Sequence, residues 1–272
     1  MRPDPWLEAT GFSNAEDETW ETFHEASKVG RHDDFPPQAS IVARMREMEE
    51  SLRFDQYPAV ALPAAHAPLA VSLSDAILGR VSARVMQPVD LSLESLASLL
   101  HHGYGVTRSS ESSGLGRALR VAPSGGALYP LEILVHTARV DGLAAGVYHY
   151  NPLRNELRLL LAGDQTPRIA AGLVPFQSHV AFDASLVLFL TALFGRTTFK
   201  YGARGYRFAL LEAGHVAQNL NLAAFGLGLG CLNLGGYFDR SIDELLGLDG
   251  LTHSTLYMLA LGERLEEPAA VR

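Results

Sequence analysis

Lys200 and Tyr201 stand next to each other in the stretch FKYGARGYRF, between two segments that predict buried structure. The apolar run ASLVLFLTALFG precedes the pair, and the helical pattern ALLEAGHVAQNLNLAAFGLG follows it. Where a pocket holds an amine beside a phenol, the two groups can take up and pass on a proton. The same side chains could also form an exposed turn, and the residues alone leave both interpretations open.

The stretch GRVSAR contains Arg80, Ser82 and Arg84 at alternate positions. In an extended chain these three side chains would share one face. Two guanidinium groups and a hydroxyl suit a phosphate, because a guanidinium group binds phosphate oxygens through paired, charge-assisted hydrogen bonds. An exposed stretch without a ligand would have the same sequence.

Two stretches of small residues would let the backbone approach a flat ligand closely, because they lack large side chains and turn N–H groups outward. One is APSGGALYP, just before the first strong strand pattern, and the other is NLGGYFD, after the long helical pattern. Their candidate ligand-facing residues are Pro123, Ser124, Gly125, Gly126, Gly235 and Gly236.

Two further motifs favour structural roles. The stretch GLGLG at residues 226–230 ends a helical pattern, and Cys231 stands where a dinucleotide-binding loop needs its third glycine. His101 and His102 are adjacent, so they point to different faces of a helix, and no further ligand follows at a metal-binding spacing. We therefore expect neither a dinucleotide loop nor a metal site.

The elements that position these motifs are helices and strands interspersed without regular βαβ alternation, which favours an α+β fold. Helices are expected at residues 72–80, 90–105 and about 206–225, with Ser74 and Ser92 as N-caps of the first two. Three strand-like runs predict an antiparallel meander, and two further strands follow. The predicted strand segments are 131–140, 146–151, 156–163, 178–194 and 252–263.

The composition limits the partners and the compartment. The chain has 272 residues, of which 47% are hydrophobic, enough for a sizeable core. A net charge of −8 argues against sequence-independent binding to nucleic acid, which needs a clustered positive face. The single cysteine, Cys231, excludes an intrachain disulfide and suits a reducing cytoplasm. The N-terminal stretch MRPDPWLEATGF lacks the apolar run of a signal peptide, so we expect a cytoplasmic protein without membrane contact.

In this order, the motifs resemble those of the FMN-dependent nitroreductase superfamily and, within it, the SagB-type dehydrogenases of the azoline oxidase branch. The likeness covers roughly residues 73–263, and ETFHEASK at residues 21–28 also resembles the amino-terminal signature of that branch. Its most specific parts are PSGGALYP and the block that runs from the Lys-Tyr pair to EAGHVAQNL.

The resemblance implies a nitroreductase-like α+β fold, in which helices flank a central, mostly antiparallel sheet, and an intertwined homodimer with two FMN sites at its interface. Residues 1–70 would form an N-terminal extension and linker that lines the substrate entrance, and residues 71–272 would form the FMN-binding domain.

The resemblance also gives each motif a role. GRVSAR and a late basic residue would hold the FMN phosphate and ribityl chain, whereas the two small-residue stretches would lie along the isoalloxazine ring, with the PSGG turn often coming from the partner subunit. Lys200 and Tyr201 would be catalytic. The FMN-binding residues implied are Arg80, Ser82, Arg84, Pro123, Ser124, Gly125, Gly126, Gln177, Gly235, Gly236 and Arg264.

The activity implied is oxidation of a thiazoline or oxazoline to the azole in peptide natural-product biosynthesis, on a peptide or carrier-bound substrate and beside other biosynthetic enzymes. The reaction removes a hydride, which FMN would accept, and a proton, for which Lys200 is the candidate base and Tyr201 the orienting or relaying group. Two alternatives remain at this point. One is an NAD(P)H-dependent reductase of nitro, quinone or enone groups, and the other is a non-catalytic scaffold of a biosynthetic complex.

Overall fold

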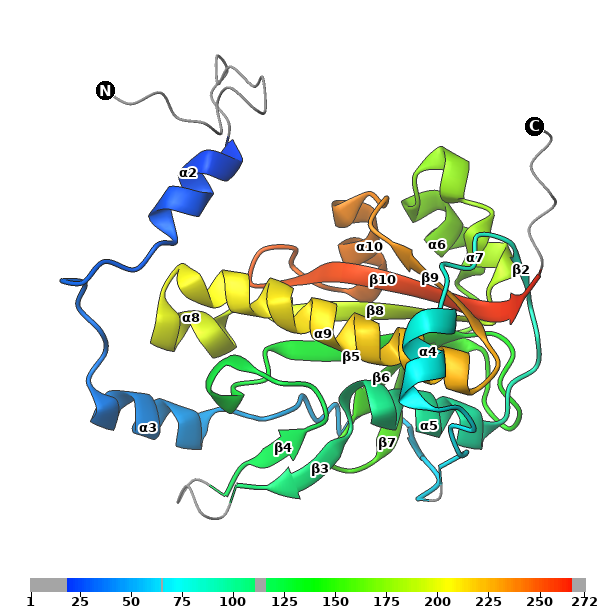
Figure 1. Cartoon of the computed structure of the whole chain (residues 1–272), viewed down its shortest axis with the longest axis horizontal. Coiled ribbons are helices and arrows are strands. Elements are labelled where there is room, and N and C mark those ends of the chain that lie inside the picture. The colour runs from blue at the N-terminus through cyan, green and yellow to red at the C-terminus, as the bar shows by residue number, and fades with distance from the viewer. Residues whose placement is uncertain (1–18, 65, 111–115, 266–272) are drawn as a thin grey trace.

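The computed structural model describes residues 19–64, 66–110 and 116–265. The N-terminal stretch MRPDPWLEATGF, which lacks the pattern of a signal peptide, lies outside the described residues. Within these ranges, eight strands form one sheet in the order β1-β7-β6-β5-β8-β10-β2, and β9 also pairs with β10 (Figure 1). Every paired neighbour in this sheet is antiparallel. The strands are β1 (Ala59–Ala61), β2 (Met86–Gln87), β5 (Leu131–Thr137), β6 (Gly146–Asn151), β7 (Glu156–Ala162), β8 (Leu186–Leu193), β9 (Gly230–Leu234) and β10 (His253–Arg264).

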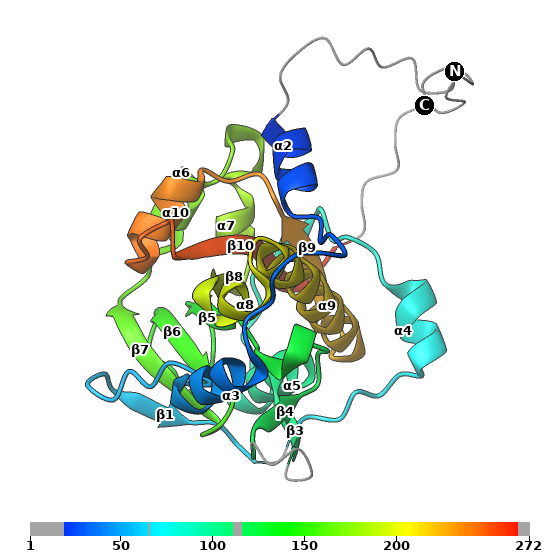
Figure 2. The same cartoon turned by 90° about the vertical axis from the view of Figure 1, so that its left-hand side faces the viewer.

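Helices cover both faces of the sheet (Figures 1 and 2). On one face α5 (Leu93–Tyr104) and α9 (Arg204–Gly226) pack on a core that includes Ile133 and Leu188. The other face carries a second core around Phe189, covered by three short helices. These are α6 (Thr166–Gly172), α7 (Val180–Asp183) and α10 (Asp239–Leu246).

The remaining elements lie at the rim of this sandwich. The strands β3 and β4 form a separate two-stranded ribbon. Among the described residues, no helix combines the length and the apolar character that a membrane crossing requires. The bounds of these elements are α2 (Thr19–Ala26), α3 (Gln38–Glu47), α4 (Leu73–Gly79), β3 (Val106–Ser109), β4 (Ala118–Arg120) and α8 (Gly195–Tyr201).

Most of the predicted elements are confirmed. The meander is β5, β6 and β7, the long helix is α9, and GLGLG ends α9 and begins β9. The Ser92 hydroxyl caps α5 by accepting the Ser95 N–H. The predicted N-cap Ser74 is wrong, because the Ser72 hydroxyl accepts the Asp75 N–H (3.0 Å) and so α4 begins one residue earlier than Ser74. The apolar segment 178–194 is also not one strand, since α7 precedes β8 within it.

The described segment from α3 to β1 lies along the body of the protein. Its strand β1 pairs with β7 at the edge of the sheet, and the Leu52 N–H donates to the Glu132 carboxylate (3.0 Å). Arg117 donates to the carbonyl of Met45 (3.0 Å) from the β3–β4 ribbon. The division into an extension (residues 1–70) and an FMN-binding domain (residues 71–272) stays a prediction.

Candidate active site

The PSGG turn precedes β5 and is held closed by Ser124. Its hydroxyl accepts the Tyr129 N–H (2.9 Å), and its carbonyl accepts the Ala127 N–H (3.1 Å). Gly126 has a φ of 68°, in the left-handed region that favours glycine. The four sequence-predicted residues of this turn are thus fixed in place, with Pro123 and Gly126 exposed and Ser124 and Gly125 half-buried.

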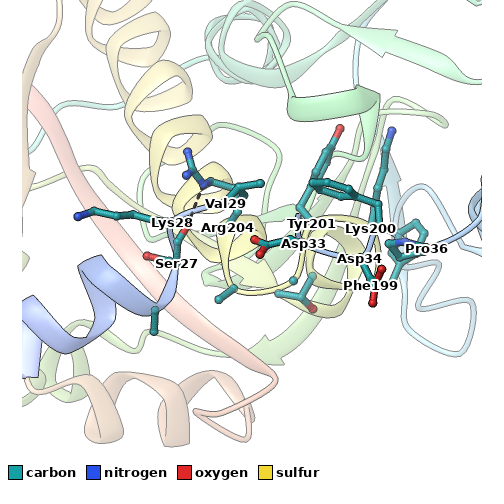
Figure 3. A pocket seen from close by; sticks show the side chains of 15 residues that line it. Ser27, Lys28, Val29, Asp33, Asp34, Pro36, Phe199, Lys200, Tyr201 and Arg204 are labelled. Carbon is teal, nitrogen blue, oxygen red and sulfur yellow. Dashed lines mark hydrogen bonds between the residues drawn. The ribbon is translucent and has the colours of Figure 1, made fainter. Parts of the chain in front are cut away.

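Lys200 and Tyr201, in the last turn of α8, reach this turn. A Cβ atom on Gly126 would lie 2.6 Å from the Tyr201 hydroxyl oxygen and 2.8 Å from Lys200 Nζ, closer than real Cβ contacts come. In Figure 3 the two side chains run next to each other and point the same way. Both are half-buried, which argues against a freely exposed turn.

Aromatic packing holds the pair in this position. Lys200 Nζ lies 5.0 Å from the centroid of the Tyr201 ring, within the range of a cation–π contact. The Tyr201 ring meets Phe208 of α9 edge to face, with 4.9 Å between centroids. Phe208 also backs the PSGG turn, since a Cβ on Gly125 would lie 3.1 Å from its ring. One side chain of α9 therefore supports both the turn and the pair.

A cavity of about 400 Å³ lies beside the pair (Figure 3). One wall is the chain between α2 and α3, which passes outside α8 (Figure 2). Two arginines of α9 fasten this chain, because Arg204 Nε donates to the Ser27 carbonyl (2.9 Å) and Arg207 Nε to the Ser27 hydroxyl (2.7 Å). The N-terminal segment is thus placed next to Lys200. The lining consists of residues 26–29, 33–36 and 198–204.

Behind the PSGG turn lies Glu212, a buried carboxyl that sequence reasoning missed. Tyr104 donates its hydroxyl proton to Glu212 Oε1 (2.6 Å), and the Ser124 hydroxyl is the neighbouring polar group. Burial raises the pKa of Glu212 to about 7, although these hydroxyls and the charges of Arg120 and Arg196 oppose the shift. The sequence pattern could have indicated it, because Glu212 stands at a position of the helical pattern EAGHVAQNL that faces the core, and a buried glutamate needs a hydrogen-bond partner.

The stretch GRVSAR lies along β9. The Ala83 N–H donates to the Cys231 carbonyl (3.0 Å), and Ser82 forms a parallel bridge with Cys231. Burial raises the pKa of the Cys231 thiol to about 12, and the charge of the nearby Arg80 opposes this rise. Arg80 and Ser82 are half-buried, whereas Arg84 is exposed.

Arg264 joins this group at the end of β10. A Cβ atom on Gly230 would lie 2.7 Å from the Cβ of Ala83 and 2.9 Å from the Cβ of Arg264, so Gly230 brings the two segments together. Arg264, the late basic residue implied by the resemblance, thus lies beside GRVSAR. The structure gathers Arg80, Ser82, Arg84 and Arg264 at one end of the sheet.

Gly235 and Gly236 follow β9 directly. A Cβ atom on Gly236 would lie 2.7 Å from Gln177 Oε1, so the structure brings these two predicted residues together. The Gly236 carbonyl accepts the Val174 N–H (2.9 Å), and this hydrogen bond holds the loop after β9 against the segment that carries Gln177. Gly235 is exposed, and a Cβ there would meet nothing within 4 Å. Open space at Gly235 fits a flat group lying on the backbone.

Within one chain, the two halves of the predicted site lie toward opposite ends of the central sheet. Arg264 ends β10, whereas the PSGG turn and α8 adjoin the other end, where Leu131 and Ser254 both pair with Ala192. Ser82 bridges Cys231, which pairs with Leu261, and Leu261 lies seven residues from Ser254 along β10, roughly 23 Å at the usual rise of a strand. This length exceeds that of one FMN molecule, so the structure does not bring GRVSAR and the PSGG turn of one chain together.

Comparison with known proteins identifies relatives along most of the chain. The model of the Nitroreductase family matches residues 77–263. A protein of Methanocaldococcus jannaschii named as a nitroreductase, MJ1384, is 35% identical over 196 residues, 72% of this chain and 93% of its own length. The microcin B17-processing protein McbC of Escherichia coli is 32% identical over 177 residues, 64% of this chain and 62% of McbC. The trifolitoxin-processing protein TfxB of Rhizobium leguminosarum bv. trifolii is 30% identical over 175 residues, 62% of this chain and 46% of TfxB.

Solved structures share the fold. A nitroreductase-type protein of Anabaena variabilis superposes with a TM-score of 0.71 at 26% identity, over 94% of this chain and 49% of that one. A chain of the E. coli microcin synthetase McbBCD complex with truncated pro-MccB17 bound gives 0.59 at 22% identity, over 97% and 95%. A protein of Exiguobacterium sibiricum in complex with FMN gives 0.53 at 16% identity, over 75% and 93%. The present chain spans less than two thirds of McbC and TfxB and about half of the Anabaena protein.

Proposed function

Because this chain belongs to the nitroreductase family, a superfamily of FMN-dependent oxidoreductases, we propose that it binds FMN and oxidises an azoline to the azole. The observation that carries the proposal is the convergence of Lys200 and Tyr201 on the PSGG turn at Gly126. A base and an orienting hydroxyl beside a glycine turn are what removal of a substrate proton needs.

The relatives support the choice of substrate. McbC and TfxB, which are 32% and 30% identical to this chain, are named for processing microcin B17 and trifolitoxin. By analogy, the substrate here is a thiazoline or oxazoline in a peptide or on a carrier. A similar fold occurs in the McbBCD complex with its pro-peptide, so we also propose other biosynthetic enzymes as partners. The reaction would take place in the cytoplasm.

The residues at the two ends of the sheet fit FMN if two chains share each site. Arg80, Arg84 and Arg264 supply guanidinium groups and Ser82 a hydroxyl, a donor set suited to a phosphate. Gly235 leaves open space where a ring could lie on the backbone. The PSGG turn of the same chain is too distant, so we propose that a second copy in a homodimer supplies it together with Lys200 and Tyr201.

Each azoline oxidation removes one hydride and one proton from two ring carbons. When bound, FMN supplies the hydride acceptor, and dioxygen takes the electrons away afterwards. Lys200 Nζ accepts the substrate proton in this proposal and later releases it to solvent. The Tyr201 hydroxyl orients the Lys200 side chain. The walls of the adjacent cavity position the peptide.

Incubation of the purified protein with azoline-containing peptides tests the proposal. The expected product has lost two hydrogen atoms from the azoline ring by mass spectrometry, and a Lys200→Met protein that retains FMN should form it far more slowly. Unchanged mass for every azoline offered, with FMN bound and dioxygen present, would contradict azoline oxidation.

The similarity to MJ1384, over 93% of its length, favours a second candidate, an NAD(P)H-dependent reductase of nitro, quinone or enone groups. Rapid loss of the 450-nm flavin absorbance on mixing with NADPH, without any peptide, would support this reductase. A colourless protein that takes up no FMN would support a scaffold instead of either enzyme.

A further inference from the structure

Arg196, in the first turn of α8, ties this helix to the segment that leads from the PSGG turn into β5. Its side chain is 6% exposed. One nitrogen, Nη2, lies 2.6 Å from Glu132 Oε1, and the other, Nη1, donates to the Tyr129 carbonyl (3.2 Å). Tyr129 stands three residues after Gly126, and Glu132 is the second residue of β5. A single guanidinium group therefore connects α8 to the end of the turn and to the start of the strand.

The Glu132 carboxylate is a fixed anchor for this arginine. Glu132 is 1% exposed, and its two oxygens also accept the Leu52 N–H (3.0 Å) and the Ser51 hydroxyl (3.2 Å). Burial would raise the pKa of Glu132, but the charge of Arg196 and the hydrogen bond with His149 outweigh burial and hold the pKa well below its usual value. Glu132 is therefore ionised. Because an unpaired buried charge is costly, Arg196 stays on this carboxylate.

Tyr129 is held in a backbone conformation that a tyrosine rarely adopts. Its φ is 46°, in the left-handed region that favours glycine, and such a conformation persists only where the surrounding structure imposes it. Here its N–H donates to the Ser124 hydroxyl (2.9 Å), and its hydroxyl accepts the Arg120 N–H (2.9 Å). The donation from Arg196 to its carbonyl is a third contact of this kind. The guanidinium group thus acts on the shape of the turn as well as on the position of α8.

Arg196 and Lys200 lie on the same face of α8. They are four residues apart, and side chains at this spacing are neighbours on an α-helix. This face is turned toward the PSGG turn, since Arg196 reaches the Tyr129 carbonyl and Lys200 Nζ lies beside Gly126. Arg196 is fixed by a buried charge, whereas the half-buried Lys200 contacts an aromatic ring and a glycine. The place of Lys200 Nζ relative to the turn therefore depends on Arg196.

We propose that Arg196 is a positioning residue for the oxidation proposed above, and the inference rests on that function. The contact from Glu132 through Arg196 to the Tyr129 carbonyl, here called the Arg196 clamp, holds α8 against the turn. It thereby sets Lys200 Nζ beside Gly126. The planar guanidinium group can do this because its nitrogens donate in two directions at once. A lysine in its place would keep a charge for Glu132, but its single nitrogen would not reproduce both contacts.

A second contact should keep α8 folded when the Arg196 clamp is weakened. The Thr197 hydroxyl donates to the Gly205 carbonyl (3.0 Å), and a Cβ atom on Gly205 would lie 2.7 Å from the Thr197 carbonyl carbon. The helix α8 is thus packed closely on the start of α9. Arg196→Lys, which also retains a positive charge beside Glu132, should therefore fold and bind FMN.

Kinetics of Arg196→Lys with an azoline-containing peptide, at saturating FMN, test the clamp through the reaction. Because a misplacement of about 1 Å can cost about 100-fold in rate, we expect kcat to fall by about that factor while KM stays within about twofold. Arg168→Lys is the matched control, since Arg168 is exposed and lies on α6, and its kcat should not change. A wild-type kcat in Arg196→Lys would overturn the proposal.

A double-mutant cycle shows whether Arg196 acts through Lys200. If it does, Arg196→Lys should reduce the residual rate less than about twofold in a protein that already carries Lys200→Met. A purely structural role would add its own loss in either protein. A further fall of about 100-fold in the double variant would therefore contradict the inference.

Amine labelling measures the position of Lys200 without any turnover. The sequence contains two lysines, Lys28 and Lys200, so Lys28 serves as the internal reference. The FMN-loaded protein is treated with sulfo-N-hydroxysuccinimide acetate, and tandem mass spectrometry gives the acetylation rate of each lysine. Because a loosened helix exposes its side chains, we expect Arg196→Lys to raise the rate at Lys200 relative to Lys28 about fivefold. An unchanged ratio would overturn the proposal, whatever the activity.

The labelling ratio also separates this inference from the proposed function. A raised ratio in a protein that oxidises no azoline would support the clamp and contradict azoline oxidation. If Arg196→Lys does not fold, Glu132→Gln decides. It leaves an oxygen that can accept from Arg196 but removes the charge, which weakens the hydrogen bond, so the ratio should rise about twofold. The wild-type ratio in Glu132→Gln would then overturn the proposal.

Discussion

The two ends of the proposed FMN site both depend on a glycine, but the atoms that each glycine leaves room for are of different kinds. At the GRVSAR end, a Cβ on Gly230 would meet the Cβ atoms of Ala83 and Arg264, which are fixed to their backbones. At the PSGG end, a Cβ on Gly126 would meet the tips of two long side chains, Lys200 and Tyr201. The GRVSAR end is thus built from packed backbone, whereas the PSGG end is built from side chains that can move.

This difference suits the role proposed for each end. A phosphate needs a constant arrangement of donors, and GRVSAR has one because Ala83 and Ser82 pair with β9. A base has to approach its substrate and then withdraw with the proton, so a side chain supported by Tyr201 and Phe208 is appropriate. Changes at the PSGG end should therefore affect rate, and changes at the GRVSAR end should affect FMN binding and stability.

The largest effect is expected from Lys200→Met. Removing a general base costs roughly 10²–10⁴-fold in rate, so azole formation should fall by that factor. Tyr201→Phe should have a smaller effect, because the ring that supports Lys200 stays in place. FMN content, measured by absorbance, should be unchanged in both proteins. Loss of FMN from Lys200→Met would place the lysine in cofactor binding instead.

Glu212→Gln should change the pH dependence of stability. Because the folded-state pKa of Glu212 is raised from 4.5 to about 7, the carboxyl favours the folded state below pH 4.5, and this contribution is lost as the pH rises through 7. The loss corresponds to about 3 kcal/mol, and the neutral glutamine should not show it.

Urea unfolding of both proteins at pH 4.5 and pH 8.5 measures this difference. The exposed Glu244, changed to Gln, is the matched control, because it lacks a buried environment. A gap between wild type and Glu212→Gln that is the same at both pH values would show that Glu212 does not titrate as expected. The PSGG turn would then have no acid behind it.

Smaller effects should separate the two glycines. Gly230→Ala forces fixed atoms apart, and overpacking of this kind typically costs about 1–3 kcal/mol of unfolding free energy. Gly126→Ala carries about 1–2 kcal/mol of backbone strain at its φ of 68° and also displaces Lys200 and Tyr201, so its rate should fall about 100-fold.

Calorimetric unfolding and azole formation, measured on both glycine variants, check this contrast. We expect Gly230→Ala to lose stability and FMN affinity while the FMN-saturated rate is retained. We expect the FMN-saturated rate of Gly126→Ala to fall. The contrast between the two ends would be wrong if both variants lost rate equally at saturating FMN.

The parts of the fold that depend on local pattern could be predicted from the sequence. Three strand-like runs, at residues 131–140, 146–151 and 156–163, identified the meander, and Ser92 identified the start of α5. The N-cap of α4 was misplaced because Ser72 and Ser74 are both good caps, and only the accepted N–H of Asp75 distinguishes them. Likewise, the strand predicted over 178–194 hid α7, because a buried one-turn helix has the same composition as a strand.

The site depends on long-range contacts that no local pattern reveals. Gln177 and Gly236 were predicted separately, and their contact follows from the loop that holds Val174. Glu212 was missed because its partner, Tyr104, lies 108 positions earlier. The separation of GRVSAR from the PSGG turn follows only from the registers in which β5, β8, β9 and β10 pair.

Activity of mixed dimers tests most directly the central claim, that two chains share each FMN site. One parent carries Arg80→Ala and Arg84→Ala, and the other carries Lys200→Met, so each homodimer should be inactive. In a purified mixed dimer, one of the two sites would combine intact arginines from one chain with an intact lysine from the other. We predict azole formation at about half the wild-type rate in that dimer. A mixed dimer as inactive as its parents would contradict the shared site.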